Sequence, residues 1–264
     1  MPTRPPRHSD DRASAHPDAE VVESGDVFFF YRPKVETEDP DGLGDVQRFH
    51  MVLRPEKGAP ARLVTIGRKH LPEVEEHERV WGFVEKAAKN AQELRRELDE
   101  RHYATRTRGT RNQPAARPAG EGVYALVRDG RALYLAYELE LPERPGPVQK
   151  ALNIPPRASF ALSIKNPERG SPSRAGLGPE REAHYRKDLQ KEFRGRRFAT
   201  EDPHLLDVEG AEFVLVGARL DPEAELGIEL PAEHEAVDTA EVFRRLRLDR
   251  GGRPIEPLTR GEWA

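Results

Sequence analysis

The chain has 264 residues, of which 34% are charged, with a formal net charge of −4 and a mean hydropathy of −0.79. No apolar stretch approaches the roughly 20 residues that a membrane-spanning helix requires, so we expect a soluble protein. The absence of cysteine excludes disulfides, thiolate nucleophiles and Cys-based zinc sites, and agrees with the reducing cytoplasm as the location.

The first 23 residues mix Pro, Arg, Asp and Ala with almost nothing to bury. They also lack the apolar core that a signal peptide requires. We therefore predict a disordered tail over residues 1–23.

The stretch "GDVFFFYRP" (Gly25–Pro33) is either a buried strand or a surface on which a ligand stacks. In a strand, Val27, Phe29 and Tyr31 lie on one face and Phe28 and Phe30 on the other, so both faces are apolar. A stacking surface would have a polar reverse face and basic residues among the rings. The pattern favours a buried strand covered on both sides.

The next segments, "VQRFHMVLRP" and "ARLVTIGRK", alternate in polarity and are separated by the turn sequence "EKGAP", which predicts a hairpin. Proline is favoured at the first position of a helix, and Pro72 precedes apolar residues at three- and four-residue steps. We predict a long helix here, with an apolar face formed by Trp81, Val84, Ala88, Ala91, Leu94 and Leu98.

The second half begins with a hairpin, because Asp129-Gly130 lies between two alternating runs. Further strands are predicted at "SFALSIKNP" and "AEFVLVGARL", and helices near 180–193 and 239–248. These elements indicate an α+β fold on a largely antiparallel sheet, with a long helix after the first three strands.

A single domain over 24–248 and an irregular C-terminal tail over 249–264 follow from these elements. The order of strands and helices roughly repeats. An alternative therefore stays open, in which two similar halves, 24–103 and 120–220, are joined by a basic linker over 104–119. No residue-level repeat accompanies that order.

The phrases "FFFYRP", "VQRFHMVLRP", "IGRKHLPEVEEHERVWGFV", "PAARPAGEGVYAL" and "SIKNPE" resemble those of a group of conserved bacterial proteins of unknown function. The resemblance spans roughly residues 25 to 217. It implies a shared fold and brings no activity, ligand or catalytic residue.

No phosphate-binding glycine loop, dinucleotide fingerprint, zinc-protease motif or serine-hydrolase elbow occurs, and we expect no cofactor. His70, Glu73 and His77 form a weak candidate for a metal site, because Glu73 and His77 share a face of the predicted helix. The alternative, which we favour, is a charged start of that helix.

Ser159, Ser163 and Lys165 share one face of their predicted strand and carry the groups of a serine–lysine nucleophilic pair. Their spacing matches no known motif, and we favour a strand-end charge for Lys165 and ordinary outward-facing serines.

A set of cations at strand and helix ends is the candidate anion site, because Arg and Lys bind phosphate and carboxylate groups. The set consists of Arg48, His50, Arg54, Arg68, Lys69, Lys165, Arg194, Arg196 and Arg197. The alternative is that these residues pair with the many acids of the chain.

Basic and acidic residues are segregated along the chain. Residues 102–119 have no acid, and residues 201–241 are overwhelmingly acidic. We predict that the basic segment is mobile and docks polyanions through Arg106, Arg108, Arg111 and Arg117.

The best interpretation is a binding module for an anionic partner, either a small ligand or a nucleic acid. One alternative is a phosphate-handling hydrolase in which His50 or His70 moves protons. A structural protein that uses its acidic C-terminal third against a basic partner is the third possibility.

Overall fold

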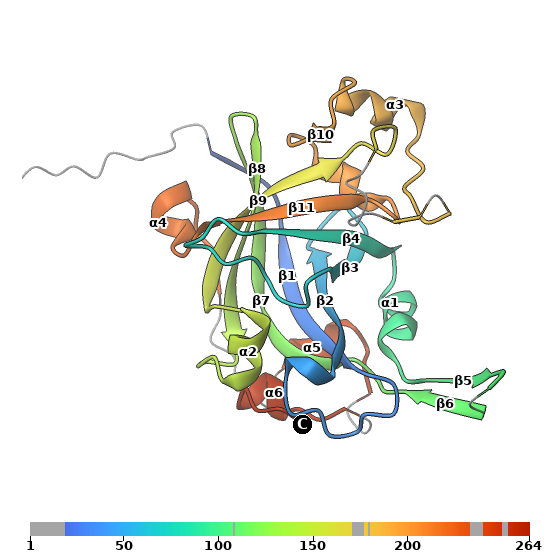
Figure 1. Ribbon diagram of the computed structural model, residues 1–264. Helices are drawn as coiled ribbons and strands as arrows, with labels where there is room; N and C mark the ends of the chain where they lie inside the picture. The colour runs from blue at the N-terminus through green and yellow to red at the C-terminus, as the bar shows by residue number, and fades with distance from the viewer. Residues whose placement is uncertain (1–18, 108, 171–176, 179, 233–239, 250–252) are drawn as a thin grey trace, which may run out of the picture.

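The computed structural model describes residues 19–107, 109–170, 177–178, 180–232, 240–249 and 253–264. Eight antiparallel strands close into a barrel (Figure 1). They are β1 (Glu20–Pro33), β2 (Val46–Pro55), β3 (Ala61–Ile66), β4 (Arg79–Ala88), β7 (Arg117–Asp129), β8 (Ala132–Leu141), β9 (Arg157–Lys165) and β11 (Glu212–Arg219).

Around the barrel the strand order is β9, β11, β4, β3, β2, β1, β7 and β8, and pairing of β8 with β9 completes the circle. A two-residue strand, β10 (Phe198–Ala199), adds to the edge of β9. Strands from 24–103 and from 120–220 meet at two seams, β1 with β7 and β4 with β11. The two sequence halves therefore share one barrel.

The barrel interior is packed with side chains from all eight strands, in keeping with the width of an eight-stranded barrel. Phe29 lies at its centre with no exposed surface, 5.1 Å from the ring of Tyr137 and 6.1 Å from that of Phe49 between centroids. The prediction of a buried strand at Gly25–Pro33 is confirmed.

A second apolar cluster covers the outer face of the same strand, where Phe28 and Phe30 are buried. The covering side chains come from α1 (Ala91–Leu98), α5 (Glu241–Arg245) and α6 (Glu256–Thr259), and from the residues that follow α5. The outer face of β7 is covered instead by Leu226, Ile228 and Leu230, at and beyond the end of α4 (Pro222–Leu226). The two apolar faces of the aromatic run thus belong to two cores.

The long helix predicted after the first three strands is wrong, because Arg79–Ala88 forms β4. Residues 81, 84 and 88 fit a helical step, but Val80, Gly82 and Val84 also fit the two-residue period of a strand and are buried. Gly82 provides space for the ring of Phe213 on β11, since a Cβ there would lie 2.5 Å from Phe213 Cζ. Pairing with β3 and β11 overrides the local helical pattern.

The α+β class is therefore also wrong, and the protein is mainly β with short helices. The region predicted as helix near 180–193 contains α3 (Lys187–Gln190) and the 3-10 helix η2 (Lys191–Phe193), and the region near 239–248 contains α5, five residues long. The remaining short helices are α2 (Pro147–Leu152), η1 (Leu43–Asp45) and η3 (Pro203–Asp207). The antiparallel pairing and the hairpin at Asp129-Gly130 agree with the prediction.

Both predicted tails differ in part from the structure. Glu20 to Glu23 belong to β1, and residues 1–18 lie outside the described residues. Near the other end, α6 packs against β7, and the ring of Trp263 lies 5.1 Å from that of Tyr31. The C-terminal residues show no extended hydrophobic periodicity, but they pack against the end of the barrel.

The segment predicted as a linker over 104–119 forms most of a hairpin, β5 (Arg101–Thr105) and β6 (Gly109–Gln113), and the start of β7. This β5–β6 hairpin projects from the lower side of the barrel (Figure 1). Among the described residues, no helix is long and apolar enough to cross a membrane.

Candidate anion-binding site

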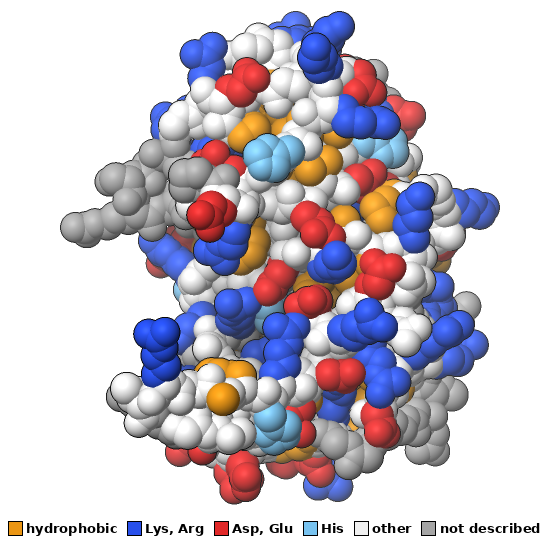
Figure 2. Space-filling view, turned by 90° about the vertical axis from the view of Figure 1, so that its right-hand side faces the viewer, with side chains coloured by type: hydrophobic (Ala, Val, Ile, Leu, Met, Phe, Trp, Pro, Cys, Tyr) orange, Lys and Arg blue, Asp and Glu red, His pale blue; other side chains and the backbone are white. Residues whose placement is uncertain are grey.

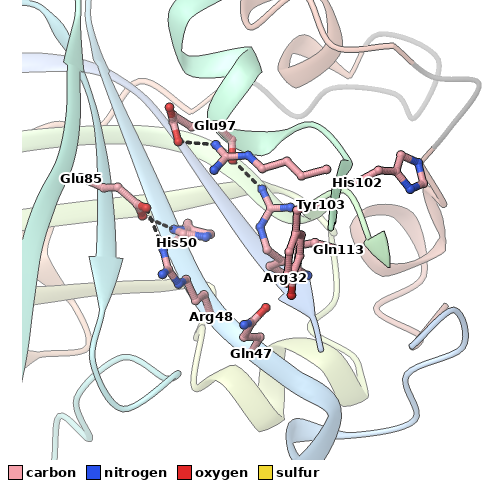
Figure 3. A pocket seen from close by; sticks show the side chains of 10 residues that line it. Arg32, Gln47, Arg48, His50, Glu85, Glu97, His102, Tyr103 and Gln113 are labelled. Atoms are coloured by element: carbon pink, nitrogen blue, oxygen red, sulfur yellow. Dashed lines mark hydrogen bonds and ion pairs between the residues drawn. The ribbon is translucent and has the colours of Figure 1, made fainter. Parts of the chain in front are cut away.

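A cleft of about 570 Å³ lies between the outer face of β1 and β2 and the β5–β6 hairpin. Its lining includes Arg32 from β1, Arg48 and His50 from β2, and Arg101 and Tyr103 from β5 (Figure 3). Figure 2 shows this side of the molecule, where acidic and basic side chains are interspersed and Lys and Arg side chains border the hollowed part.

Strand register brings the basic side chains of β1 and β2 together. Arg32 lies directly opposite Arg48 in the β1–β2 pair, and His50 lies opposite Phe30 on β1 and Thr65 on β3. Like charges that face each other directly across a pair of strands destabilise a sheet unless another group compensates them. The pairing therefore concentrates positive charge on one part of the barrel surface.

Glu85 lies beside these basic side chains because β4 has a β-bulge at that position. The register with β3 shifts between the pairs Leu63–Lys86 and Val64–Val84, and such a bulge redirects a side chain. Its carboxylate accepts hydrogen bonds from Arg48 Nη1 at 2.7 Å and from the Thr65 hydroxyl at 2.6 Å.

Arg32 anchors the hairpin to the barrel. Its guanidinium donates to the carbonyl oxygens of Glu97 at 2.5 Å, Asp99 at 3.2 Å and Pro114 at 2.6 Å, which flank the β5–β6 hairpin. All three partners are neutral. Burial, together with the guanidinium groups of Arg101 and Arg253, lowers the pKa of Arg32 to about 10, so the side chain stays charged at neutral pH.

The hairpin contributes a third guanidinium and an aromatic ring. Arg101 donates to the carboxylate of Glu97, and its side chain is 50% exposed. The ring of Tyr103 is 44% exposed beside it. Three guanidinium groups therefore face the carboxylates of Glu85 and Glu97, which leaves a surplus of positive charge.

His50 is buried at the base of the cleft with 2% of its surface exposed. Burial and the charges of Arg32, Arg48 and Arg101 lower its pKa to about 3, so the imidazole is neutral at physiological pH. Its Nδ1 atom lies 3.0 Å from Thr65 Oγ. Its Nε2 atom is buried without a hydrogen-bond partner among the described residues.

Two of the predicted anion-binding residues, Arg48 and His50, thus lie together in the cleft. The other cations of that set pair elsewhere, as the salt-bridge alternative expects. Their partners are Asp26 for Arg54, Glu78 for Arg68, the Val46 carbonyl for Lys69, Glu212 for Lys165, Glu201 for Arg194 and Arg196, and the Gly170 carbonyl for Arg197.

The predicted polyanion-docking arginines are divided between surface and interior. Arg117 is 7% exposed and donates to the Glu38 carbonyl, and burial lowers its pKa. Arg111 lies 3.7 Å from Glu36, and Arg106 is exposed on the hairpin. Arg108 lies outside the described residues.

The weak metal candidate is not assembled. Residues 71–78 form a loop rather than a helix, so the shared helix face of Glu73 and His77 does not exist. His70 Nδ1 donates to the Leu71 carbonyl at 2.8 Å and His77 Nδ1 to the Gly217 carbonyl at 2.9 Å. Within the described ranges, no group of three or more His, Asp or Glu side chains is arranged to hold a metal ion.

The serine–lysine pair is not formed, and the expectation of ordinary outward residues is wrong for Ser159 and Lys165, which are both buried. Strands rise about 3.3 Å per residue, so Ser159 and Lys165 lie about 20 Å apart along β9. Lys165 is buried and pairs with Glu212 at 3.0 Å. Ser163 lines a groove on the outer surface with Trp81 and Phe198.

Sequence reasoning missed Arg32, Glu85, Glu97, Arg101 and Tyr103. A charged residue that directly follows the aromatic run, as Arg32 does, was the available signal. The role of Glu85 has no local signature, because it depends on a bulge in a strand that was assigned to a helix.

Comparison of the chain with protein-family models, with curated proteins and with solved structures finds no match in any of the three. The resemblance to a group of bacterial proteins therefore stays an expectation, and the function is inferred from the geometry of the cleft.

Proposed function

We propose that this chain is a binding protein for a small anionic ligand, a phosphate or carboxylate compound held in the cleft beside the β5–β6 hairpin. The observation that carries the proposal is the convergence of Arg32, Arg48 and Arg101 on one cleft. Planar guanidinium groups bind such anions through charge-assisted, bidentate hydrogen bonds.

The energetic argument rests on charge balance. Arg32 is buried and donates to neutral carbonyls, and it lies opposite Arg48. An anion in the cleft would add to the compensation that Glu85 gives Arg48, and the partial burial of the site would limit screening by solvent. The surplus of positive charge in the cleft therefore favours the binding of a negatively charged group.

Binding is a better-supported role than hydrolysis. A general acid or base works best when its pKa lies near the working pH. His50, with a pKa of about 3, is a weak base and is already deprotonated at neutral pH. His70 is outside the cleft lining and uses Nδ1 on a backbone carbonyl.

A purely structural role for the acidic C-terminal third has less support, since many of its acids already have basic partners. These pairs are Glu201 with Arg194 and Arg196, Asp207 with Arg62, Glu209 with Lys86, Glu212 with Lys165, Glu223 with Arg157 and Glu225 with Arg219. Nucleic acid also has less support than a small anion, because Arg117 is buried and Arg111 lies beside Glu36.

Calorimetric titration of the full chain with inorganic phosphate and with succinate tests the proposal. We expect saturable binding that weakens about tenfold or more in Arg48→Gln or Arg101→Gln, because each change removes a charge-assisted hydrogen bond. Arg68→Gln is the matched control. Arg68 donates to Glu78 at 2.6 Å, much as Arg48 donates to Glu85 at 2.7 Å, but lies outside the cleft lining.

Absence of saturable binding of both anions would refute the proposal. Equal weakening by Arg68→Gln and Arg48→Gln would also refute it, because the interaction would then reflect general surface charge. A loss confined to the two cleft variants supports the assignment.

A further inference from the structure

The cleft contains a polar atom whose need for a partner is unmet. His50 Nε2 is buried and has no hydrogen-bond partner among the described residues. A buried polar atom in this state raises the free energy of the free protein relative to one in which the atom is satisfied. His50 lines the cleft beside Arg48, so a bound ligand is placed to supply the missing partner.

The hydrogen bonds of Thr65 determine what kind of partner Nε2 requires. The carboxylate of Glu85, which also pairs with Arg48, is an acceptor only, so the single hydroxyl proton of Thr65 points to Glu85 Oε2 at 2.6 Å. Thr65 Oγ has then no proton for the imidazole 3.0 Å away, and Nδ1 of His50 must be the donor.

A neutral imidazole has one proton, and here Nδ1 carries it. Nε2 is therefore a lone-pair acceptor beside the guanidinium donors of the cleft, Arg32, Arg48 and Arg101. Its position at the base of the cleft adds a requirement for a donor, which neither a carboxylate nor a fully ionised phosphate ester supplies.

We infer that the ligand is a hydroxylated organic anion, with a phosphate or carboxylate group for Arg48 and Arg101 and an adjacent hydroxyl that donates a hydrogen bond to His50 Nε2. This inference rests on the proposed function and specifies its ligand class. Because Nε2 is buried, binding requires the side chains of Arg48 and Arg101, which are 44% and 50% exposed, to shift from their ion pairs with Glu85 and Glu97 and admit the hydroxyl.

Two other partners for Nε2 fit the site less well. A metal ion would meet three guanidinium charges, which oppose a second cation. A proton taken up with the anion would make Nε2 a donor, but an adjacent opposite charge raises a pKa by about 1 to 3 units. From about 3, such a rise leaves His50 mostly neutral at pH 7.5.

The test uses pairs of anions with the same charged groups that differ in their hydroxyls: glycerol 3-phosphate against propyl phosphate, and malate against succinate. In calorimetric titrations at pH 7.5, we expect the hydroxylated member of the preferred pair to bind about fivefold to tenfold more tightly. The pair with the higher affinity distinguishes a phosphate from a carboxylate ligand. His50→Leu should abolish the preference and retain affinity for the other member.

Equal affinity within both pairs overturns the inference and leaves the proposed function intact. A preference that persists in His50→Leu also overturns it, because another group would then recognise the hydroxyl. Failure of all four compounds to bind refutes the proposed function itself, and the inference with it.

Titration in two buffers with different ionisation enthalpies provides a further check. Equal observed enthalpies, which mean no proton uptake, support the inference, and uptake of one proton overturns it. If His50→Leu does not fold, Thr65→Val replaces it, since that change removes the acceptor that holds Nδ1–H. We expect Thr65→Val to reduce the preference for the hydroxylated compound, whereas an unchanged preference counts against the inference.

Discussion

The guanidinium of Arg62 holds the carboxylate of Glu23 bidentately inside one end of the barrel, with Nη1 2.5 Å from Oε1 and Nη2 2.8 Å from Oε2. Asp207 accepts from Arg62 Nε at 2.7 Å, and the hydroxyl of Tyr124 donates to Glu23 at 2.7 Å. Burial by itself would lower the pKa of Arg62, but its bonds to Glu23 and the charges of Glu23 and Asp207 raise it above its ordinary value. The network thus keeps a charged group in the interior.

Arg62→Met should lower the free energy of unfolding by about 3 to 5 kcal/mol, because it leaves the carboxylate of Glu23 buried without its partner. Urea denaturation measures the loss. The double variant Arg62→Met/Glu23→Gln should recover part of it. Arg54→Met, at the partly exposed pair with Asp26, is the control and should cost less than about 1 kcal/mol. Equal losses in Arg62→Met and Arg54→Met would contradict the buried network.

Phe29→Ala should lower the free energy of unfolding by about 3 to 5 kcal/mol, since it opens a cavity in the middle of the barrel. Tyr103→Ala is an exposed aromatic control and should change stability by less than about 0.5 kcal/mol. Chemical denaturation of both variants gives the comparison. A folded Phe29→Ala protein of unchanged stability would be incompatible with the packed interior.

His50 should make the stability of the protein depend on pH. In the unfolded chain a histidine gains its proton below pH of about 6.5, whereas in the folded protein the pKa of His50 is about 3. Between these values the unfolded state binds more protons, so the contribution of His50 is present above pH of about 6.5 and is lost as the pH falls towards 3. Well within this window the expected slope is about 1.4 kcal/mol per pH unit.

The measurement compares the native protein with His50→Gln by denaturation at several pH values. Other groups titrate in the same range, so the difference between the two proteins isolates His50. Curves that stay parallel from pH 7 to 4 would show that His50 titrates normally in the folded protein.

Arg32→Met should loosen the β5–β6 hairpin without unfolding the barrel, since it removes the donor to three carbonyls beside the hairpin. Hydrogen bonds from a charged donor are worth about 1.5 to 3 kcal/mol, so amide exchange in β5 and β6 should accelerate about 10-fold to 100-fold. Exchange in β7 and β8 serves as the internal control. Trypsin should also cut faster at Arg106. Unchanged exchange in the hairpin would remove the anchoring role of Arg32.

Local sequence predicted the elements whose pattern clearly favours one interpretation. The aromatic run at Gly25–Pro33 is apolar on both faces of a strand, which favours burial over a stacking surface, and Asp129-Gly130 between alternating runs favours a tight hairpin. The mainly-β class was missed because Arg79–Ala88 fits both a helical and a strand period. Its pairing with Glu212–Arg219, more than a hundred residues away, decided between them.

The cleft residues also divide into those that local sequence predicted and those that only contacts between distant parts of the chain brought together. Arg48 and His50 were predicted as anion-binding residues because they alternate on one strand face, which is a local property. Arg32, Glu85 and Arg101 joined them only through strand register, a bulge and the anchored hairpin. For Val46–Pro55, the sequence by itself determined that Arg48 and His50 share the outer face of the strand. Only the closed barrel decided which side chains from other elements meet them, because the distance between side chains on different strands depends on pairings that no local pattern encodes.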